Sequence, residues 1–516
     1  MADVRRGTAA PGGRGPDLAI AVALLVGAAV YVARLPRVLG GSDEGIFLYE
    51  AKRLLEGQVF YRDVFDLITP GSHYLMAALF WLFGTDIATA RIADAVVHGL
   101  IVAVTYAICR TLGVRRTLAA AAALLDVAVF EPAWTVASPH WFATLLGLVL
   151  LFVLVRRPRY EALVAGVVTG ALVAVQQQKG AVLGTGAALV LASDALLVGG
   201  GGGSLVRRLG AFAGGVLLVV VPLMGALVAM AGAAPVFQAL VLHPLVNYRG
   251  RAAGAPWGYL GPFAWYARYT FPRVLPWEPV LTALMAMRVA VALVRGDDPE
   301  RLRRSLVLTV MSLAAVGSIA YFADYIHLAF IGPVFAVLAA DLLEAALGGL
   351  ARRAPVGARV AGGLTAVLVL AGVAFQLRTV MAGSWQDYPI AYRSPFGTLH
   401  FHHRKEIDML ERVRAVLDAA GAKELFIYPA GAGFYLLTGT TNPTAYQFLV
   451  PGYSRPDQLE DAAATLARRR VPFVLVFFPL GRGEPVADEV LAHYEAVLHG
   501  SDGQPLLWRR LPEEVH

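Results

Sequence analysis

Two adjacent carboxylates, Asp43 and Glu44, follow an apolar run that is long enough to cross a bilayer. A carboxylate at such a boundary can accept a proton from a hydroxyl group or contribute oxygen ligands to a metal ion. The same residues suit the start of a helix, where Ser42 or Asp43 can cap unpaired N–H groups and negative charge complements the helix dipole. Both roles are compatible, because a helix N-terminus keeps a carboxylate ionised. Asp43 and Glu44 are therefore candidate proton acceptors or metal ligands.

Composition places these carboxylates in a membrane protein. Of the 516 residues, 57% are hydrophobic and only 16% are charged, with a mean hydropathy of +0.61. A soluble protein would carry about 25% charged residues. The net charge is +7, and the arginines cluster in short segments between apolar blocks. This clustering is typical of the cytoplasmic loops of membrane proteins rather than of a nucleic-acid-binding surface. The single cysteine, Cys109, excludes an intrachain disulfide.

The apolar blocks predict about eleven transmembrane helices within residues 1–377. We expect spans near 17–36, 87–109, 117–131, 138–155, 161–177, 181–198, 209–231, 275–294, 305–323, 326–346 and 360–377. Basic clusters separate pairs of these blocks and mark the cytoplasmic side, so we expect the N-terminus inside and the tail outside. A cleaved signal peptide is an alternative interpretation of the first span.

The first long outer segment, 37–86, contains two shorter helical patterns. An amphipathic helix, which we expect to lie along the membrane surface, is predicted by apolar residues at helical spacing and by polar residues between them. The apolar positions are Ile46, Phe47, Ala51, Leu54 and Leu55, and the polar positions are Glu50, Lys52, Arg53 and Glu56. The run HYLMAALFWLFG (73–84) is too short to span and predicts an interfacial or re-entrant helix.

The tail, 378–516, has a different pattern. Helical segments alternate with the short apolar runs ELFIYP (424–429), VPFVLVFF (471–478) and PLLWRRL (505–511). We therefore expect a small extracytoplasmic α/β domain with a largely parallel sheet, and a helix over 485–500 before the last run. PAGAG (429–433) follows a strand but lacks the dinucleotide fingerprint, so no cofactor is assigned to it.

The order of motifs over residues 17–115 resembles the first extracytoplasmic loop of the GT-C glycosyltransferases. It is most similar to bacterial members akin to protein O-mannosyltransferases and to the aminoarabinose transferase that acts on lipid A. The motifs that carry the resemblance are the first span, SDEG (42–45), GQVFYRDV (57–64), TPGSHYLMAALFWLFG (69–84) and TDIATARIADAV (85–96). The resemblance is looser through the later spans and weakest in the tail. It implies a GT-C-like, mainly α polytopic membrane protein.

The resemblance also implies a reaction and its partners. A sugar carried on a polyprenyl phosphate would pass to a glycan, lipid or protein acceptor at the outer face of the cytoplasmic membrane, with inversion. Attack by an acceptor hydroxyl needs a general base, and the departing lipid phosphate needs cations or a metal. The family's catalytic acidic residue maps onto Asp43, with Glu44 sharing its task or binding metal. Nucleic acid is not an expected partner.

Further site residues follow from the same resemblance, each with a simpler alternative. The expected donor-phosphate ligands are Lys179, Arg249, Arg251, Arg273 and His327, and the expected supporting residues are Asp63, Asp66, His73, Asp324 and Tyr325. Lys179 could instead extend to the headgroup region, and the arginines could simply anchor an aromatic-rich loop. Asp63 and Asp66 could lie in a solvated turn, and ADYIHLAF (323–330) could be a polar turn between spans. Arg91 and Asp94 could form a structural ion pair.

The sequence leaves open whether the protein binds a metal ion and whether it is an active enzyme. Some relatives bind a divalent ion, but the first loop has neither an H-x-x-H motif nor paired-carboxylate spacing, and HFHHRKE (400–406) is metal-like only in composition. A lipid or sugar transporter, including a flippase, is an alternative function, although no internal repeat supports it. A catalytically inactive assembly partner is another, because fold does not establish activity.

Overall fold

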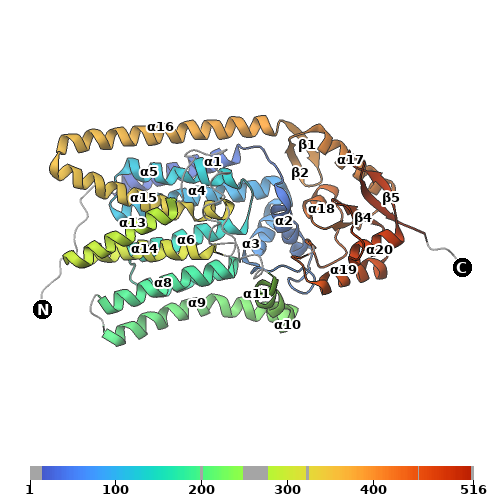
Figure 1. Cartoon of the computed structure of the whole chain (residues 1–516), viewed down its shortest axis with the longest axis horizontal. Helices are drawn as coiled ribbons and strands as arrows, with labels where there is room; N and C mark the ends of the chain where they lie inside the picture. The colour runs from blue at the N-terminus through green and yellow to red at the C-terminus, as the bar shows by residue number, and fades with distance from the viewer. Residues whose placement is uncertain are drawn as a thin grey trace.

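The computed structural model describes residues 14–197, 201–247, 277–320, 325–450, 452–501 and 503–512. Long helices run side by side in one bundle, and a smaller domain containing the β-strands lies at one end of it (Figure 1). The helices of the bundle are α1 (Arg14–Ala33), α4 (Ile87–Leu112), α5 (Arg116–Leu125), α6 (Pro139–Arg156), α7 (Glu161–Val175), α8 (Gln177–Leu197), α9 (Gly201–Ala231), α13 (Trp277–Arg295), α14 (Pro299–Ser318), α15 (Tyr325–Arg353) and α16 (Pro355–Asp387).

Each predicted span coincides with one of these helices. Among the described residues, seven helices are long and apolar enough to cross a membrane, namely α1, α4, α6, α8, α9, α15 and α16. The chain is therefore a multi-pass membrane protein, while the number of crossings stays a prediction. Helix α5 passes into a π-helical turn (Asp126–Phe130) and a 3-10 turn (Glu131–Ala133). Helix α16 continues to Asp387, ten residues beyond the predicted end of its span at 377.

Small residues bring some of the bundle helices close together. A Cβ added to Gly166 of α7 would lie 2.1 Å from the carbonyl oxygen of Phe212 in α9. A Cβ added to Gly215 of α9 would lie 2.4 Å from the carbonyl oxygen of Leu163 in α7. Such contacts let helix backbones approach closely, which favours association in lipid. Large apolar side chains remain exposed on the bundle surface, as in Leu218 of α9, as a lipid-facing surface requires.

Two short helices separate the bundle from the small domain, α2 (Gly41–Leu55) and α3 (Gly71–Phe83) (Figure 1). The placement of the first of them along the membrane surface stays a prediction, but its polar side is not simply exposed to water. Tyr49 and Arg53 are buried, because these positions contact the small domain. The Tyr49 ring stacks on Tyr435 with 4.5 Å between centroids, and Arg53 donates from Nη1 to Gln447 Oε1 at 2.7 Å.

The short elements after α9 are α10 (Ala233–Phe237), a π-helical turn (Gln238–Leu242) and α11 (His243–Asn247). The small domain contains a hairpin of β1 (Ile390–Ser394) and β2 (Gly397–Phe401), and a sheet of β3 (Phe426–Tyr428), β4 (Phe473–Val476), β5 (Tyr494–His499) and β6 (Pro505–Arg510). Its helices are α17 (Arg404–Ala419), α18 (Gly433–Thr438), α19 (Pro456–Arg469) and α20 (Pro485–His493).

The sheet differs from the predicted one. Its strand order is β3-β4-β6-β5, and only β3 and β4 are parallel, whereas β6 is antiparallel to both β4 and β5. The helix predicted over 485–500 ends at His493, and the following residues form the edge strand β5. The residues YEAVLH (494–499) fit a strand because they pair with β6, a contact that local helical spacing does not reveal. The prediction of a largely parallel sheet was wrong, although the α/β character is confirmed.

Candidate active site

A cavity of about 530 Å³ lies where the ends of several bundle helices meet α2, α3 and the small domain. This volume is in the range of small-molecule sites. Asp43 lines the cavity together with two groups of polar residues. The acidic cluster consists of Glu50, Asp66 and His73, and the basic cluster consists of His140, Lys179 and His327. The small domain contributes Gln447, Phe448, Val450, Tyr453 and Ser454.

Asp43 lies in the first turn of α2 with its side chain exposed, at the cavity wall. The N-cap of this helix is Gly40, so neither Ser42 nor Asp43 occupies the capping position. The positive end of the helix dipole still favours an ionised carboxylate at this place. Asp43 can therefore present a charged carboxylate to a molecule bound in the cavity.

Glu44 points elsewhere and is almost fully buried. Its Oε1 accepts from the backbone N–H of Ala137 at 2.8 Å, and its Oε2 accepts from that of Gly40 at 2.8 Å and from Arg91 Nη2 at 2.9 Å. Arg91 Nη1 contacts Oε1 as well. These donors occupy the acceptor positions of the carboxylate, and Glu44 does not line the cavity. Glu44 thus fixes the start of α2 to α4, and Arg91 pairs with Glu44 rather than with the expected Asp94.

The three residues of the basic cluster lie in the first turns of three different helices. His140 belongs to α6, Lys179 to α8 and His327 to α15. The N-terminal ends of helices carry partial positive charge and unpaired N–H groups, which together favour a bound anion. Because the three side chains add donors at the same place, the cluster suits a phosphate group.

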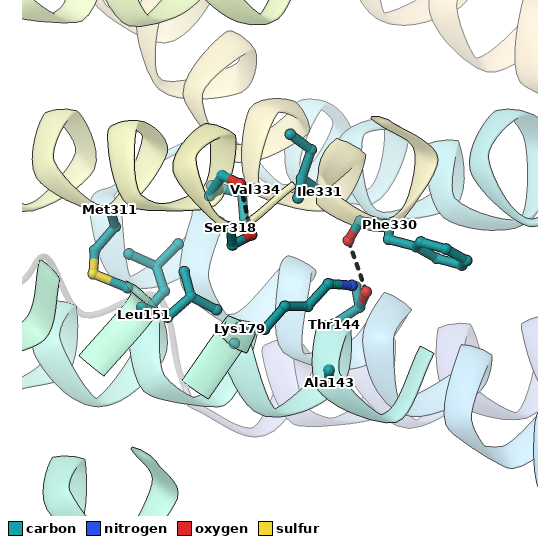
Figure 2. Close-up of a pocket in the computed structure, with 12 residues that line it drawn as sticks. Ala143, Thr144, Leu151, Lys179, Met311, Ser318, Phe330, Ile331 and Val334 are labelled. Atoms are coloured by element: carbon teal, nitrogen blue, oxygen red, sulfur yellow. Dashed lines mark hydrogen bonds between the residues drawn. The ribbon is translucent and has the colours of Figure 1, made fainter. Parts of the chain in front are cut away.

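Lys179 is the buried centre of this cluster. Its Nζ lies 2.9 Å from His140 Nδ1 and 4.8 Å from the centre of the Phe330 ring. His140 stacks on Phe330 with 4.5 Å between ring centroids, and His327 meets His140 edge-on at 5.1 Å. Figure 2 shows Lys179 beside Thr144, whose hydroxyl donates to the Phe330 carbonyl at 2.7 Å and so joins α6 to α15. The packing holds Lys179 Nζ in one position.

His140 was not identified from the sequence, although SPHW (138–141) carries the signal of a helix start. Ser138 is the N-cap of α6 and accepts from the backbone N–H of His140 at 3.3 Å, while Pro139 is the first helical residue. What the sequence does not reveal is that α8 and α15 begin beside it. The expected phosphate ligands Arg249, Arg251 and Arg273 lie outside the described residues, as does the expected supporting residue Asp324. Tyr325 begins α15, but its side chain is not described.

The acidic cluster joins three side chains from different elements. His73 Nε2 lies 3.2 Å from Glu50 Oε2 and 3.7 Å from Asp66 Oδ2. Burial raises the pKa of Glu50 to about 8 and lowers the pKa of His73 to about 4. Burial and the neighbouring Glu50 also raise the pKa of Asp66 well above its ordinary value. Two carboxyl groups and an imidazole in this arrangement could hold a metal ion, and the described residues contain no other such group.

The sequence predicted Asp66 and His73 as supporting residues but treated Glu50 only as a polar helix position. Its spacing carried a signal, because a residue seven positions after Asp43 returns to the same helix face. Asp63 is absent from the cavity lining. Its Oδ2 accepts from the Val59 backbone at 2.8 Å and its carboxylate pairs with Arg62, as expected for the solvated-turn alternative.

Comparison with solved structures identifies the fold. Crystal structures of ArnT from Cupriavidus metallidurans, one bound to undecaprenyl phosphate and one in the apo state, both match with a TM-score of 0.57. The match covers 98% of this chain in the first case and 97% in the second, and 99% of each ArnT chain, at 14% sequence identity. This chain has the GT-C fold. No protein-family model matches the chain, and no curated protein matches its sequence. The resemblance noted in the sequence is thus confirmed at the level of fold over nearly the whole chain.

Proposed function

We propose that this protein is a glycosyltransferase that moves a sugar from a polyprenyl-phosphate carrier to an acceptor at the outer face of the cytoplasmic membrane. The observation that carries the proposal is the shared cavity, which brings the Asp43 carboxylate together with a basic cluster at three helix N-termini. A base and an anion site are the two features that displacement of a lipid phosphate by a hydroxyl group requires. The fold supports the lipid part, because an ArnT structure holds undecaprenyl phosphate.

In this proposal Asp43 acts as the general base. It takes the proton of the acceptor hydroxyl as that oxygen attacks the anomeric carbon from the face opposite the phosphate. The bond between the anomeric carbon and the phosphate oxygen breaks, and its electron pair leaves with the polyprenyl phosphate. One bond forms as one breaks, so the configuration at the anomeric carbon is inverted.

The basic cluster stabilises the departing phosphate. The negative charge on the phosphate oxygen grows as the bond breaks, and a buried ammonium group acts strongly on it because water is excluded. Lys179 is positioned for this by His140 and Phe330. His327 is the second cluster residue that the sequence had assigned to the phosphate. Arg249, Arg251 and Arg273 stay proposed as additional ligands.

Membrane orientation follows from the same proposal. The basic clusters of the sequence place the N-terminus in the cytoplasm, so the cavity and the domain after α16 face outward. The cavity would then be covered from the acceptor side by Gln447, Phe448, Val450, Tyr453 and Ser454. We place the boundary between the membrane domain and this outer domain near Asp387, where α16 ends.

The test is a transfer assay with the purified full-length protein in liposomes. Undecaprenyl-phosphate sugars are supplied with an acceptor extract from cell envelopes, and the release of undecaprenyl phosphate is measured. We expect release with at least one donor. Donor binding without release would favour the inactive-partner alternative, and movement of lipid between leaflets without cleavage would favour a flippase.

A further inference from the structure

We propose that Arg34 and Arg378 form a binding site for the headgroup of an anionic phospholipid. The site lies at the seam between α1 and α16, at the ends of these helices nearer the small domain. The partner is a lipid of the surrounding bilayer and the cavity takes no part, so the proposal goes beyond sugar transfer. Only the leaflet in which the lipid lies rests on the proposed orientation.

Both helices expose an apolar face that leads to an arginine. On α1 the exposed apolar residues recur at every fourth position, and they are Leu18, Val22, Val26 and Val30. On α16 they share one helix face, and they are Leu364, Leu368 and Phe375. Arg34 and Arg378 follow at the same helical spacing with exposed side chains. Because lipid tails cover such apolar faces, both arginines lie where the hydrocarbon region ends.

Two hydrogen bonds join the helix ends that carry these arginines. The hydroxyl of Tyr31 donates to the carbonyl oxygen of Leu377 at 3.0 Å. The indole N–H of Trp385 donates to the carbonyl oxygen of Arg34 at 3.1 Å. Because Leu377 directly precedes Arg378, the two bonds hold both arginines at the same end of the neighbouring helices.

The positive charge at the seam is not neutralised by the part of the chain that the structure describes. Neither Arg34 nor Arg378 forms an ion pair there, although other bundle arginines do, such as Arg115 with Glu344. Asp387, at the end of α16, is exposed and is not ion-paired with either of them. A guanidinium group presents several N–H donors in a plane and matches phosphate oxygens well. Two such groups without a carboxylate partner suit a phosphodiester.

A third cation and an aromatic ring complete the seam. The backbone N–H of Arg37 donates to His400 Nδ1 at 3.1 Å, and the His400 ring meets Trp385 edge-on with 4.9 Å between centroids. Trp385 is 43% exposed, as is usual for a tryptophan at the headgroup level of a membrane protein. Arg37 thereby adds positive charge beside the two arginines of the site.

The surplus of positive charge favours an anionic lipid over a zwitterionic one. Phosphatidylglycerol has no cation of its own, whereas phosphatidylcholine carries a positive choline group beside its phosphate. Each basic residue near an anionic membrane surface strengthens binding about fivefold. In the proposed orientation this end of the bundle lies outside, where arginine is not needed to set the topology, so lipid binding gives these arginines a role.

The test counts bound lipid by native mass spectrometry of the full-length protein in mild detergent. Phosphatidylglycerol or phosphatidylcholine is titrated in. We expect the wild-type protein to retain phosphatidylglycerol preferentially, and the double variant Arg34→Gln, Arg378→Gln to bind it at least about tenfold more weakly. Its weak binding of phosphatidylcholine should not change.

The control is the double variant Arg469→Gln, Arg509→Gln. It changes the net charge by the same amount, but both arginines are exposed in the small domain and ion-paired with Glu424 and Glu495. We expect it to bind phosphatidylglycerol as the wild type does. Equal retention of the two lipids by the wild-type protein, or equal losses in the two double variants, would overturn the proposal.

Cross-linking locates the bound lipid. Wild-type protein in liposomes that contain a photoreactive phosphatidylglycerol is illuminated, and the modified peptides are mapped. Modification within residues 34–37 or 374–385 supports the site, and modification confined to other segments contradicts it. This measurement decides if the arginine variant does not fold. Neither experiment measures sugar transfer, so failure of this site and failure of the proposed transferase function are distinguishable.

Discussion

At the scale of single residues, Asp43 and Glu44 are neighbours in sequence with opposite surroundings. Asp43 lines the cavity with an exposed side chain, whereas Glu44 is buried among backbone N–H groups and Arg91. Adjacent helical residues point about 100° apart, so one of them can face the cavity while the other anchors the helix. We therefore propose a chemical role for Asp43 only, and a structural role for Glu44.

Glu44→Ala should destabilise the fold strongly, because it leaves the Arg91 guanidinium buried without its partner. Breaking a buried ion pair from one side costs about 3–5 kcal/mol. Thermal unfolding in detergent would measure the loss. The double variant Glu44→Ala, Arg91→Ala should lose clearly less than the sum of the two single variants. Additive losses would show that the pair does not act as a unit.

At the scale of elements, the site depends on where helices begin. The first turns of α6, α8 and α15 meet at the basic cluster, and α2, α3 and the segment between them bring the acidic cluster to the same cavity. Lys179 and His327 could be located at membrane boundaries from the sequence, because apolar blocks end there. His140 and Glu50 could not be found in this way, since their significance comes from elements that meet only in the folded chain.

Lys179→Met should weaken donor use while keeping the aliphatic packing against Phe330. A charge-assisted contact with phosphate contributes about 1.5–3 kcal/mol, so kcat/KM for the donor should fall about 10- to 150-fold. Initial rates at varied donor concentration would show this. Lys52→Met is the matched control, because Lys52 is paired with Glu56 away from the cavity lining. Equal effects of the two substitutions would remove Lys179 from the site.

Gly45→Ala should loosen the contact between α2 and the small domain. An added Cβ would lie 2.5 Å from the backbone nitrogen of Gly433, which has no flexible side chain to move aside. Overpacking of this kind costs about 1–3 kcal/mol. Limited proteolysis should release the small domain sooner, whereas Gly27→Ala, where a Cβ meets nothing within 4 Å, should behave as wild type. Unchanged proteolysis in Gly45→Ala would contradict this account of the interface.

At the scale of the whole molecule, the α2–α3 layer lies between the bundle and the small domain (Figure 1), and side chains from all three parts line the cavity. The positions of the membrane helices could be predicted from sequence because each needs about 20 apolar residues in a row. The sheet order and the burial of α2 could not, because both depend on pairing between distant segments. Tyr494 to His499 continue a helical pattern and yet form a strand, since β6 offers them a partner.

Orientation gives a prediction at this scale. Gly57 and Asp457 are both exposed, and we propose that both lie outside the cell membrane. A cysteine introduced at either position should therefore react with a membrane-impermeant thiol reagent in intact cells. Gly357→Cys, at the opposite end of the bundle, should react only after lysis. The native Cys109 is buried and should stay unlabelled. The reverse labelling pattern would place the cavity on the cytoplasmic side.

The most direct measurement of the central claim is the transfer rate of Asp43→Asn. The substitution keeps the size of the side chain and removes its ability to accept a proton, and Gly40 rather than Asp43 is the N-cap, so the helix start is retained. A positioned general base contributes about 10²–10⁴-fold in rate. We expect Asp43→Asn to fold and bind undecaprenyl-phosphate sugar as wild type while kcat falls at least about a hundredfold, with Asp63→Asn as the acidic control that keeps full activity. Transfer by Asp43→Asn at a near-normal rate would contradict the assignment of Asp43 as the base.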